Sequence, residues 1–185
     1  MRLVVGISGT SGVIYGIRLL EELKKKKIET HLILTKASEQ IIKEETNLSK
    51  DDVEALATHH YDIDSFMAPI ASGSFKTDGM VVIPCSMRTL SGIAHGYSEN
   101  LLLRAADVTI KERRPLILVP RETPLSPIHL NNMLKLSRIG VTLLPAMPAF
   151  YHKPKSIDDI VNFVVGKVLD ILEVDNSLYK RWGMP

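Results

Sequence analysis

The 185-residue sequence predicts an α/β fold in which helices cover both faces of a mainly parallel sheet, giving three layers. Short aliphatic and β-branched runs alternate along the chain with segments whose apolar residues recur at helical spacing. Most of these runs are apolar throughout, as expected of strands that are buried on both faces. Sheets of this kind bind ligands at the carboxyl ends of their strands, so the residues after each strand are the candidates for function.

The predicted strands are five apolar runs that are too short to be helices. The first stops at Ser8-Gly9, and the third ends at a proline and a cysteine, Pro84-Cys85. In chain order the predicted strands span residues 3–7, 31–35, 79–85, 115–119 and 141–144.

The predicted helices are marked by their ends. The lysines at 24–27 stand where the carboxyl end of a helix favours cations. Ser49 and Asp52 are spaced as a capping box, and Ser126 and Ser156 suit the N-caps of two later helices. Between the helices and strands, residues 59–77 are irregular and long for a loop, which predicts a functional or partly folded segment. In chain order the predicted helices span 13–27, 37–46, 49–57, 87–95, 99–111, 127–138 and 157–173.

The composition excludes several classes of protein. With 23 Lys+Arg against 21 Asp+Glu, the formal net charge is +2, too balanced for general attraction to nucleic acid. The single cysteine, Cys85, favours a reducing compartment, and we expect a cytoplasmic protein. No stretch approaches the ~18 apolar residues of a membrane span, and the short apolar N-terminus predicts a first strand and not a signal peptide. The six histidines lack metal-ligand spacing, so we expect no metal, and we expect one domain over 1–185 that ends in a helix and tail.

The loop after the first predicted strand, GISGTSG over residues 6–12, leads directly into a helix. Glycines allow a ligand to approach the backbone closely, and a helix N-terminus favours an anion. The spacing is not that of the dinucleotide fingerprint, and the second strand ends in Thr35-Lys36 without an acidic residue for a ribose. The loop therefore favours a mononucleotide such as FMN over NAD, with an ordinary strand-to-helix turn as the alternative.

Three further strand ends carry polar or aromatic side chains. Residues 84–89, PCSMRT, offer hydroxyls, a cation and backbone amides that suit a phosphate or a ring carbonyl, and Cys85 among them is predicted to be a buried structural thiol. Arg121 and Glu122 indicate an anion clamp beside a proton donor or acceptor, or else a surface ion pair. The proline-rich loop 145–154 presents aromatic rings that suit an apolar or allylic group bearing a phosphate, or else a hydrophobic plug.

Taken in order, these stretches resemble the flavin prenyltransferase family, the UbiX-like enzymes. The matching stretches are GISGTSGVIYGIRLL, the run from DGMVVIP to LNNMLKL, PAMPAFYHKP and the RWG near the end, which together span nearly the whole chain. The resemblance implies a Rossmann-like, flavodoxin-like fold and a homododecamer with active sites at subunit interfaces. It also implies transfer of the dimethylallyl group of dimethylallyl monophosphate to N5 and C6 of reduced FMN, without a metal. The product, prenylated FMN, would serve a UbiD-type decarboxylase.

Carried over residue by residue, the resemblance implies three groups of site residues. The positions that match FMN-binding residues are Gly9, Thr10, Ser11, Thr35, Ser86, Met87, Arg88, Thr89 and Arg121. The prenyl phosphate matches Tyr151 and Lys167 with support from Arg104, Lys111 and Arg121, and Trp182 would help to cover the allylic group. The positions matched for proton handling are Ser11, Glu45 and Glu122.

Two positions depart from the common family pattern. Lys167 stands where Arg is common, so the phosphate would meet a point charge and not a two-pronged guanidinium. Thr10 stands where Ala is common, which is tolerated if its hydroxyl finds a partner.

Two other functions stay open. One is an FMN-dependent oxidative decarboxylase of cysteine on the same fold, disfavoured because the PAFYHKP loop is present and the histidine and cysteine-bearing flap of those enzymes are missing. The other is a non-catalytic flavin carrier, which the presence of Glu45, Glu122, Tyr151 and Lys167 disfavours.

Overall fold

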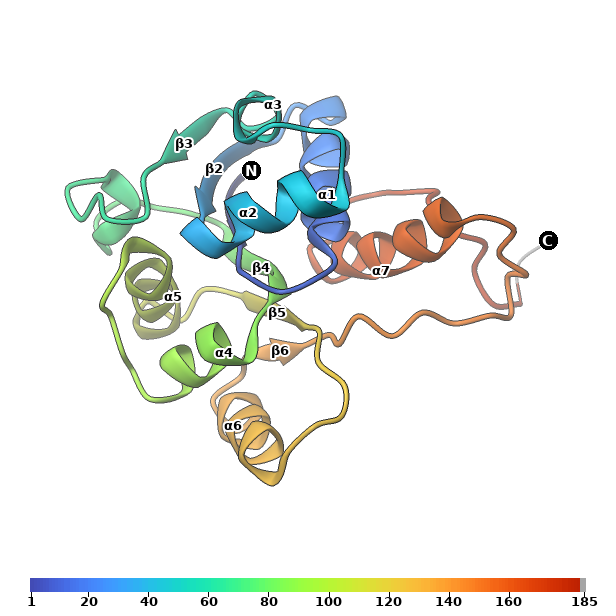
Figure 1. Cartoon of the computed structure of the whole chain (residues 1–185). Coiled ribbons are helices and arrows are strands. Elements are labelled where there is room, and N and C mark those ends of the chain that lie inside the picture. The colour runs from blue at the N-terminus through green and yellow to red at the C-terminus, as the bar shows by residue number, and fades with distance from the viewer. Residues whose placement is uncertain (184–185) are drawn as a thin grey trace.

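The computed structural model describes residues 1–183, which contain one sheet of six parallel strands in the order β3-β2-β1-β4-β5-β6. The sheet and its covering helices are shown in Figure 1. The predicted domain, 1–185, also includes residues 184 and 185, which lie outside the described part. The strands are β1 (Arg2–Ile7), β2 (Glu29–Leu34), β3 (His59–Tyr61), β4 (Gly79–Cys85), β5 (Leu116–Pro120) and β6 (Thr142–Leu143).

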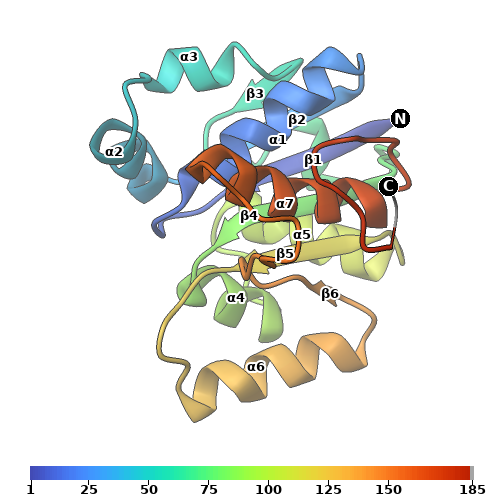
Figure 2. The ribbon, with the colours of Figure 1, turned by 90° about the vertical axis from the view of Figure 1, so that its right-hand side faces the viewer.

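Helices cover both faces of this sheet, as predicted. Side chains of β1 alternate between two apolar cores: Leu3, Val5 and Ile7 pack with α1 and α7, whereas Val4 packs with α4 and α5. Figure 2 shows α1 and α7 together on one side of the strands. The helices are α1 (Val13–Lys25), α2 (Lys36–Glu45), α3 (Lys50–Glu54), α4 (Met87–Ala94), α5 (Leu101–Lys111), α6 (Pro127–Arg138) and α7 (Ile157–Ile171), with a short 3-10 helix, η1 (Pro69–Ala71).

The predicted helix caps are confirmed where the sequence named them. Ser49 and Asp52 form a capping box at α3, and Ser126 and Ser156 accept hydrogen bonds from backbone N–H groups at the starts of α6 and α7. Helix α5 begins two residues later than predicted because Asn100 caps it. A local side-chain acceptor thus fixes where each of these helices begins.

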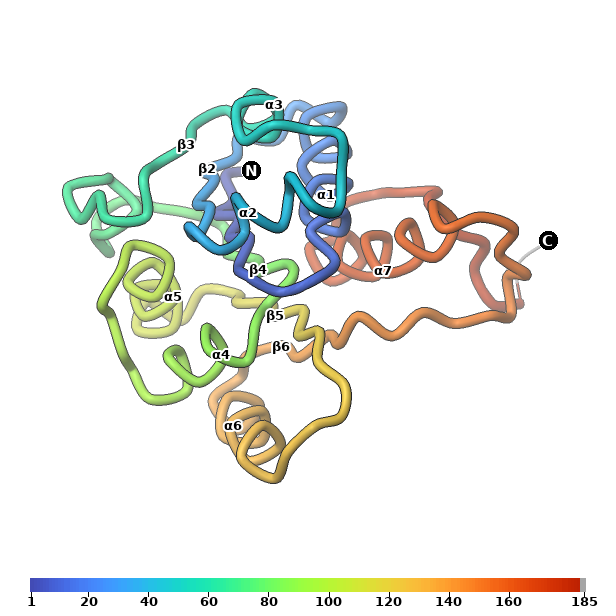
Figure 3. Tube along the Cα trace, in the orientation of Figure 1, coloured from blue at the N-terminus to red at the C-terminus, as the bar shows by residue number. Residues whose placement is uncertain are grey.

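The prediction missed one strand and overextended another. β3 consists of two histidines and a tyrosine and pairs only with β2 at the edge of the sheet, so it lacks the apolar run that marks a buried strand. β6, at the opposite edge, has two residues where four were predicted. After β6 the chain runs away from the sheet in an extended stretch before it enters α7, as Figure 3 shows. Within residues 1–183, no helix has both the length and the apolar character needed to cross a bilayer.

Candidate active site

A pocket of 770 Å³ lies at the carboxyl ends of β1, β2 and β4. Its volume is within the range of about 300–1,000 Å³ that is usual for small-molecule and cofactor sites. Glu122, at the end of β5, also lines it. Of the residues predicted to bind FMN, the pocket brings together Gly9, Thr10, Thr35, Ser86, Met87, Arg88 and Thr89.

The loops after β1 and β4 are held together at the pocket by Ser8, a fully buried residue. Its hydroxyl donates to the carbonyl of Pro84 at 3.0 Å and accepts from the backbone N–H of Ser86 at 2.7 Å. The sequence analysis treated Ser8 only as the end of a strand. Its role follows from the pairing of β1 with β4, which the sequence spacing does not reveal.

Two helices direct their N-termini at the pocket. Thr35 caps α2 by accepting from the Ser38 N–H at 3.1 Å, and Ser86 caps α4 by accepting from the Thr89 N–H at 3.2 Å. The positive ends of both helix dipoles therefore face the same space, which favours an anion there. Cys85, at the end of β4, is completely buried as predicted, and burial raises the pKa of its thiol, which disfavours the reactive thiolate.

Gly9 is required by the close approach of two loops. A Cβ at this position would lie 2.3 Å from the Cβ of Ala37 at the start of α2. Beside it, the Thr10 hydroxyl donates to the carbonyl of Arg121 at 3.2 Å, so the hydroxyl that departs from the family pattern has a partner. The loops after β1, β2 and β5 therefore form one connected wall.

The N-terminus of α1 is occupied by a carboxylate of the protein itself. The backbone N–H groups of Gly12 and Val13 donate to Oε2 of Glu45 at 2.8 and 3.2 Å. Glu45 was predicted to handle protons, and the sequence placed an anion at this helix start. In this arrangement Glu45 is that anion, so a ligand phosphate could bind α1 only if Glu45 moved away.

Arg121 and Glu122 point to different partners and are not the ion pair that the sequence left open. Arg121 Nε donates to the carbonyl of Ser11 at 3.2 Å, which ties β5 to the first loop. The carboxylate of Glu122 accepts from the N–H of Thr123 at 3.1 Å. Glu122 lines both the large pocket and a recess of 80 Å³ that Met133 also lines, so this residue borders two cavities.

The residues expected at the prenyl donor lie outside this pocket in the same chain. Tyr151 and Trp182 pack edge to face with ring centres 5.3 Å apart, and Tyr151 also contacts Phe163 of α7. Lys167 Nζ, also on α7, lies 3.9 Å from the carboxylate of Asp170. None of these residues is part of the pocket lining.

Arg104 and Lys111, both on α5, are also engaged elsewhere. Arg104 Nε donates to the carbonyl of Ala71 at 3.0 Å, and its guanidinium pairs with Asp107. Lys111 pairs with Glu112 at the far end of the helix from the pocket. One chain thus assembles seven of the nine predicted flavin residues at the pocket. Ser11 and Arg121 are missing from its lining, and none of the predicted phosphate-binding cations lines it.

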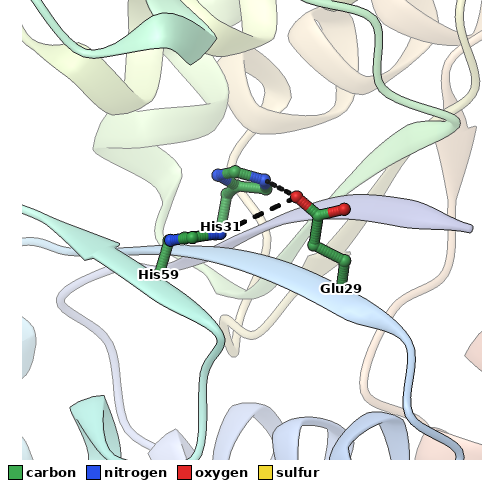
Figure 4. A group of neighbouring side chains, drawn as sticks. All are labelled: Glu29, His31 and His59. Atoms are coloured by element: carbon green, nitrogen blue, oxygen red, sulfur yellow. Dashed lines mark hydrogen bonds and ion pairs between the residues drawn. The ribbon is translucent and has the colours of Figure 1, made fainter.

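A second polar cluster, near the amino ends of the strands, was not foreseen. Glu29, His31 and His59 each offer one atom that could bind a metal ion, and these three atoms lie within 4.8 Å of one another. Figure 4 shows the three side chains. Spacing along the sequence could not reveal it, because His59 belongs to the unpredicted strand β3. The guanidinium of Arg2 already donates to the Glu29 carboxylate at 2.8 Å, and His31 Nδ1 lies 2.9 Å from the Tyr61 hydroxyl. We interpret the cluster as a polar network that joins β1, β2 and β3.

The comparisons with known proteins agree with one another. Residues 1–169 match the family described as Flavoprotein. The chain is 56% identical over 183 residues to a protein named flavin prenyltransferase UbiX from Methanocaldococcus jannaschii, covering 99% of each chain. A crystal structure described as a dodecameric FMN-dependent Ubix-like decarboxylase from Escherichia coli has a TM-score of 0.98 and 50% identity and covers 100% of both chains.

A second solved structure is described as AnUbiX (PadA1) in complex with FMN and dimethylallyl pyrophosphate. It has a TM-score of 0.97 and 46% identity, and it covers 99% of this chain and 97% of its own. A structure described as the epidermin biosynthesis protein EpiD from Staphylococcus aureus shares the fold alone, with 21% identity and a TM-score of 0.64. The full-length identity to the first group decides the assignment: this chain belongs to the UbiX flavin prenyltransferase family of flavoproteins.

Proposed function

We propose that this chain transfers the dimethylallyl group of dimethylallyl monophosphate to N5 and C6 of reduced FMN. The product, prenylated FMN, would be the cofactor of a UbiD-type decarboxylase. The observation that carries this proposal is the pocket at the carboxyl ends of β1, β2 and β4, which gathers seven of the nine positions matched to FMN-binding residues of the family.

The pocket has the chemistry that FMN requires. The starts of α2 and α4 and the cation of Arg88 favour a phosphate. Ile63, Met87 and Leu103 supply apolar walls for a flat ring system. The missing side chain of Gly9 lets the first loop pack against α2 without filling this space. Bound reduced FMN would supply the electron-rich ring that is alkylated.

Glu122 is the residue that we assign to proton transfer. Bond formation at C6 requires loss of a ring proton, and Glu122 is an acidic residue in the lining of the pocket. Its position between the large pocket and the smaller recess suits a base that meets both substrates. Glu45 and Ser11 are weaker candidates, because Glu45 is engaged with the α1 backbone and neither residue lines the pocket.

We further propose that the prenyl phosphate is held by protein cations and a phenol that come from more than one subunit. Departure of the phosphate builds up negative charge that nearby donors must stabilise. Tyr151, Lys167, Arg104 and Lys111 do not line the pocket of their own chain, so neighbouring copies of the chain would have to bring them there. A homo-oligomer, such as the dodecamer described for the solved relative, would satisfy this requirement.

The test is anaerobic incubation of the protein with reduced FMN and either dimethylallyl monophosphate or dimethylallyl diphosphate, followed by mass spectrometry of the released flavin. We expect a five-carbon addition with the monophosphate. A flavin of unchanged mass with both donors refutes prenyl transfer. Loss of carbon dioxide from a C-terminal cysteine peptide would then identify a cysteine decarboxylase, and FMN binding with neither reaction would identify a carrier.

Two variants test the assigned roles. Glu122→Gln is expected to bind FMN normally and to slow transfer by roughly 10²–10⁴-fold. Glu44→Gln changes an exposed carboxylate that does not line the pocket and is the control, expected to stay within a few-fold of the wild type. Co-expression of Glu122→Gln with Tyr151→Phe should restore activity in mixed oligomers, whereas no restoration would place both residues in a site made by one chain.

A further inference from the structure

The chain that follows α7 folds back onto that helix and is held by one carboxylate. Both oxygens of Asp170 are used: Arg181 donates to them through Nη2 at 2.7 Å and Nη1 at 3.0 Å. The Tyr179 hydroxyl donates to Oδ2 at 2.5 Å, and the Asn176 side-chain amide donates to Oδ1 at 2.9 Å. Three residues of the tail, 172–183, therefore converge on a side chain that is only 18% exposed.

A glycine one turn earlier makes room for the same contact. A Cβ at position 166 would lie 2.5 Å from Cδ1 of Tyr179, so the tyrosine ring packs directly against the bare backbone of Gly166. The Asn176 amide also lies 3.3 Å from the Gly166 carbonyl. The tail is thus held on α7 both by packing of Tyr179 against Gly166 and by hydrogen bonds to the charged Asp170.

The anchored tail places Trp182 against Tyr151, one of the residues that we propose to hold the prenyl donor. Trp182 directly follows Arg181 and packs edge to face on Tyr151 at 5.3 Å. Tyr179 packs on Phe163 at 5.0 Å, and Phe163 in turn contacts Tyr151 at 6.0 Å. Asp170 is therefore linked to Tyr151 by two routes, through Arg181 and Trp182 and through Tyr179 and Phe163.

Asp170 also lies beside the expected phosphate-binding cation. Its Oδ2 is 3.9 Å from Nζ of Lys167, one turn earlier on α7. Burial raises the pKa of Asp170, but the hydrogen bonds from Arg181, Tyr179 and Asn176 outweigh it and hold the pKa below its usual value. The side chain is thus an anion at neutral pH and can orient the flexible ammonium of Lys167.

We propose that Asp170 is a positioning residue for the prenyl donor: it anchors the tail so that Trp182 covers Tyr151, and it orients Lys167. The part that concerns the donor rests on the proposed function, whereas the anchoring of the tail does not. Asp170 itself would not touch the reacting atoms.

The first test uses the only tryptophan of the chain, Trp182, as a probe in protein without substrates. Asp170→Asn removes the charge of the anchor, and Gly166→Ala pushes Tyr179 away while leaving every charge in place. Both variants are expected to lower the tryptophan fluorescence anisotropy and to speed tryptic cleavage after Lys180 and Arg181. The exposed Asp175 provides the matched control, Asp175→Asn, which should behave as wild type.

The second test is kinetic. Loss of charge-assisted hydrogen bonds predicts a rise of about tenfold or more in the donor KM for both Asp170→Asn and Gly166→Ala, with FMN affinity within twofold of wild type. Unchanged anisotropy in both variants would refute the anchor. Lower anisotropy with an unchanged donor KM would show that Asp170 only holds the tail on α7, and it would overturn the positioning role. If wild-type protein transfers no prenyl group, the positioning role falls with the proposed function, and the anisotropy still decides the anchor.

Discussion

Replacing Ser8 by alanine tests whether the pocket depends on the link between the loops after β1 and β4. The change removes the hydroxyl that donates to the Pro84 carbonyl and accepts from the Ser86 N–H. The Pro84 carbonyl keeps a hydrogen bond from the Ser8 backbone N–H at 3.2 Å. The Ser86 N–H, however, loses its acceptor, which is the hydroxyl of the fully buried Ser8. An orphaned donor of this kind costs about 1–3 kcal/mol, so we expect a loss of about 2 kcal/mol in the free energy of unfolding.

The assay is urea unfolding at one fixed protein concentration, because association between copies would otherwise change the apparent stability. A loss of about 2 kcal/mol corresponds to a fall in Tm of about 4–8 °C for a chain of this size. If FMN binding must restore order to the loosened loops at a cost of about 1 kcal/mol, the FMN Kd rises about fivefold. Ser177→Ala, at an exposed serine, is the control. A Ser8→Ala protein within about 0.5 kcal/mol of wild type would show that the link contributes little.

Three further outcomes are expected. Gly16→Ala places a Cβ 2.4 Å from the carbonyl of Ile83 and should cost about 1–3 kcal/mol by urea unfolding, with little loss for the control Gly92→Ala, which meets only a leucine side chain at 3.0 Å. Thr35→Val should remove the cap of α2 and about 1 kcal/mol of stability, which Thr35→Ser should retain. Burial lowers the pKa of His31, so the unfolded chain binds the proton more readily. Stability should therefore be full above about pH 6.5 and fall as the pH drops below it, and His31→Gln should lessen that slope; equal slopes would contradict the reasoning.

The position of the pocket could be predicted from the sequence because it follows from the class of sheet. Buried parallel strands place their carboxyl ends at one edge, so the residues after strands 1, 2 and 3 of the prediction had to meet there. Gly9, Thr35 and Ser86 do line one pocket. The assignment of those positions to FMN came from the family resemblance and not from the spacing.

The contacts between distant segments could not be predicted in this way. Glu45 lies 33 residues from Gly12, and no local pattern indicates that it would occupy the N-terminus of α1. β3 was missed because two histidines and a tyrosine at a sheet edge carry no apolar signature. Its pairing with β2 is what brings His59 to Glu29 and His31.

By itself the sequence determined five of the six strands, the helices and the helix caps that it named, because these depend on side chains within a few residues of one another. Only the tertiary structure decided which side chains share a space: it placed Ser8 against Ser86, 78 residues away, and gathered the tail onto Asp170. It also separated Tyr151 and Lys167 from the large pocket of their own chain. The physical reason is that such contacts depend on strand order and helix packing, which bring together groups whose spacing along the chain carries no regular pattern.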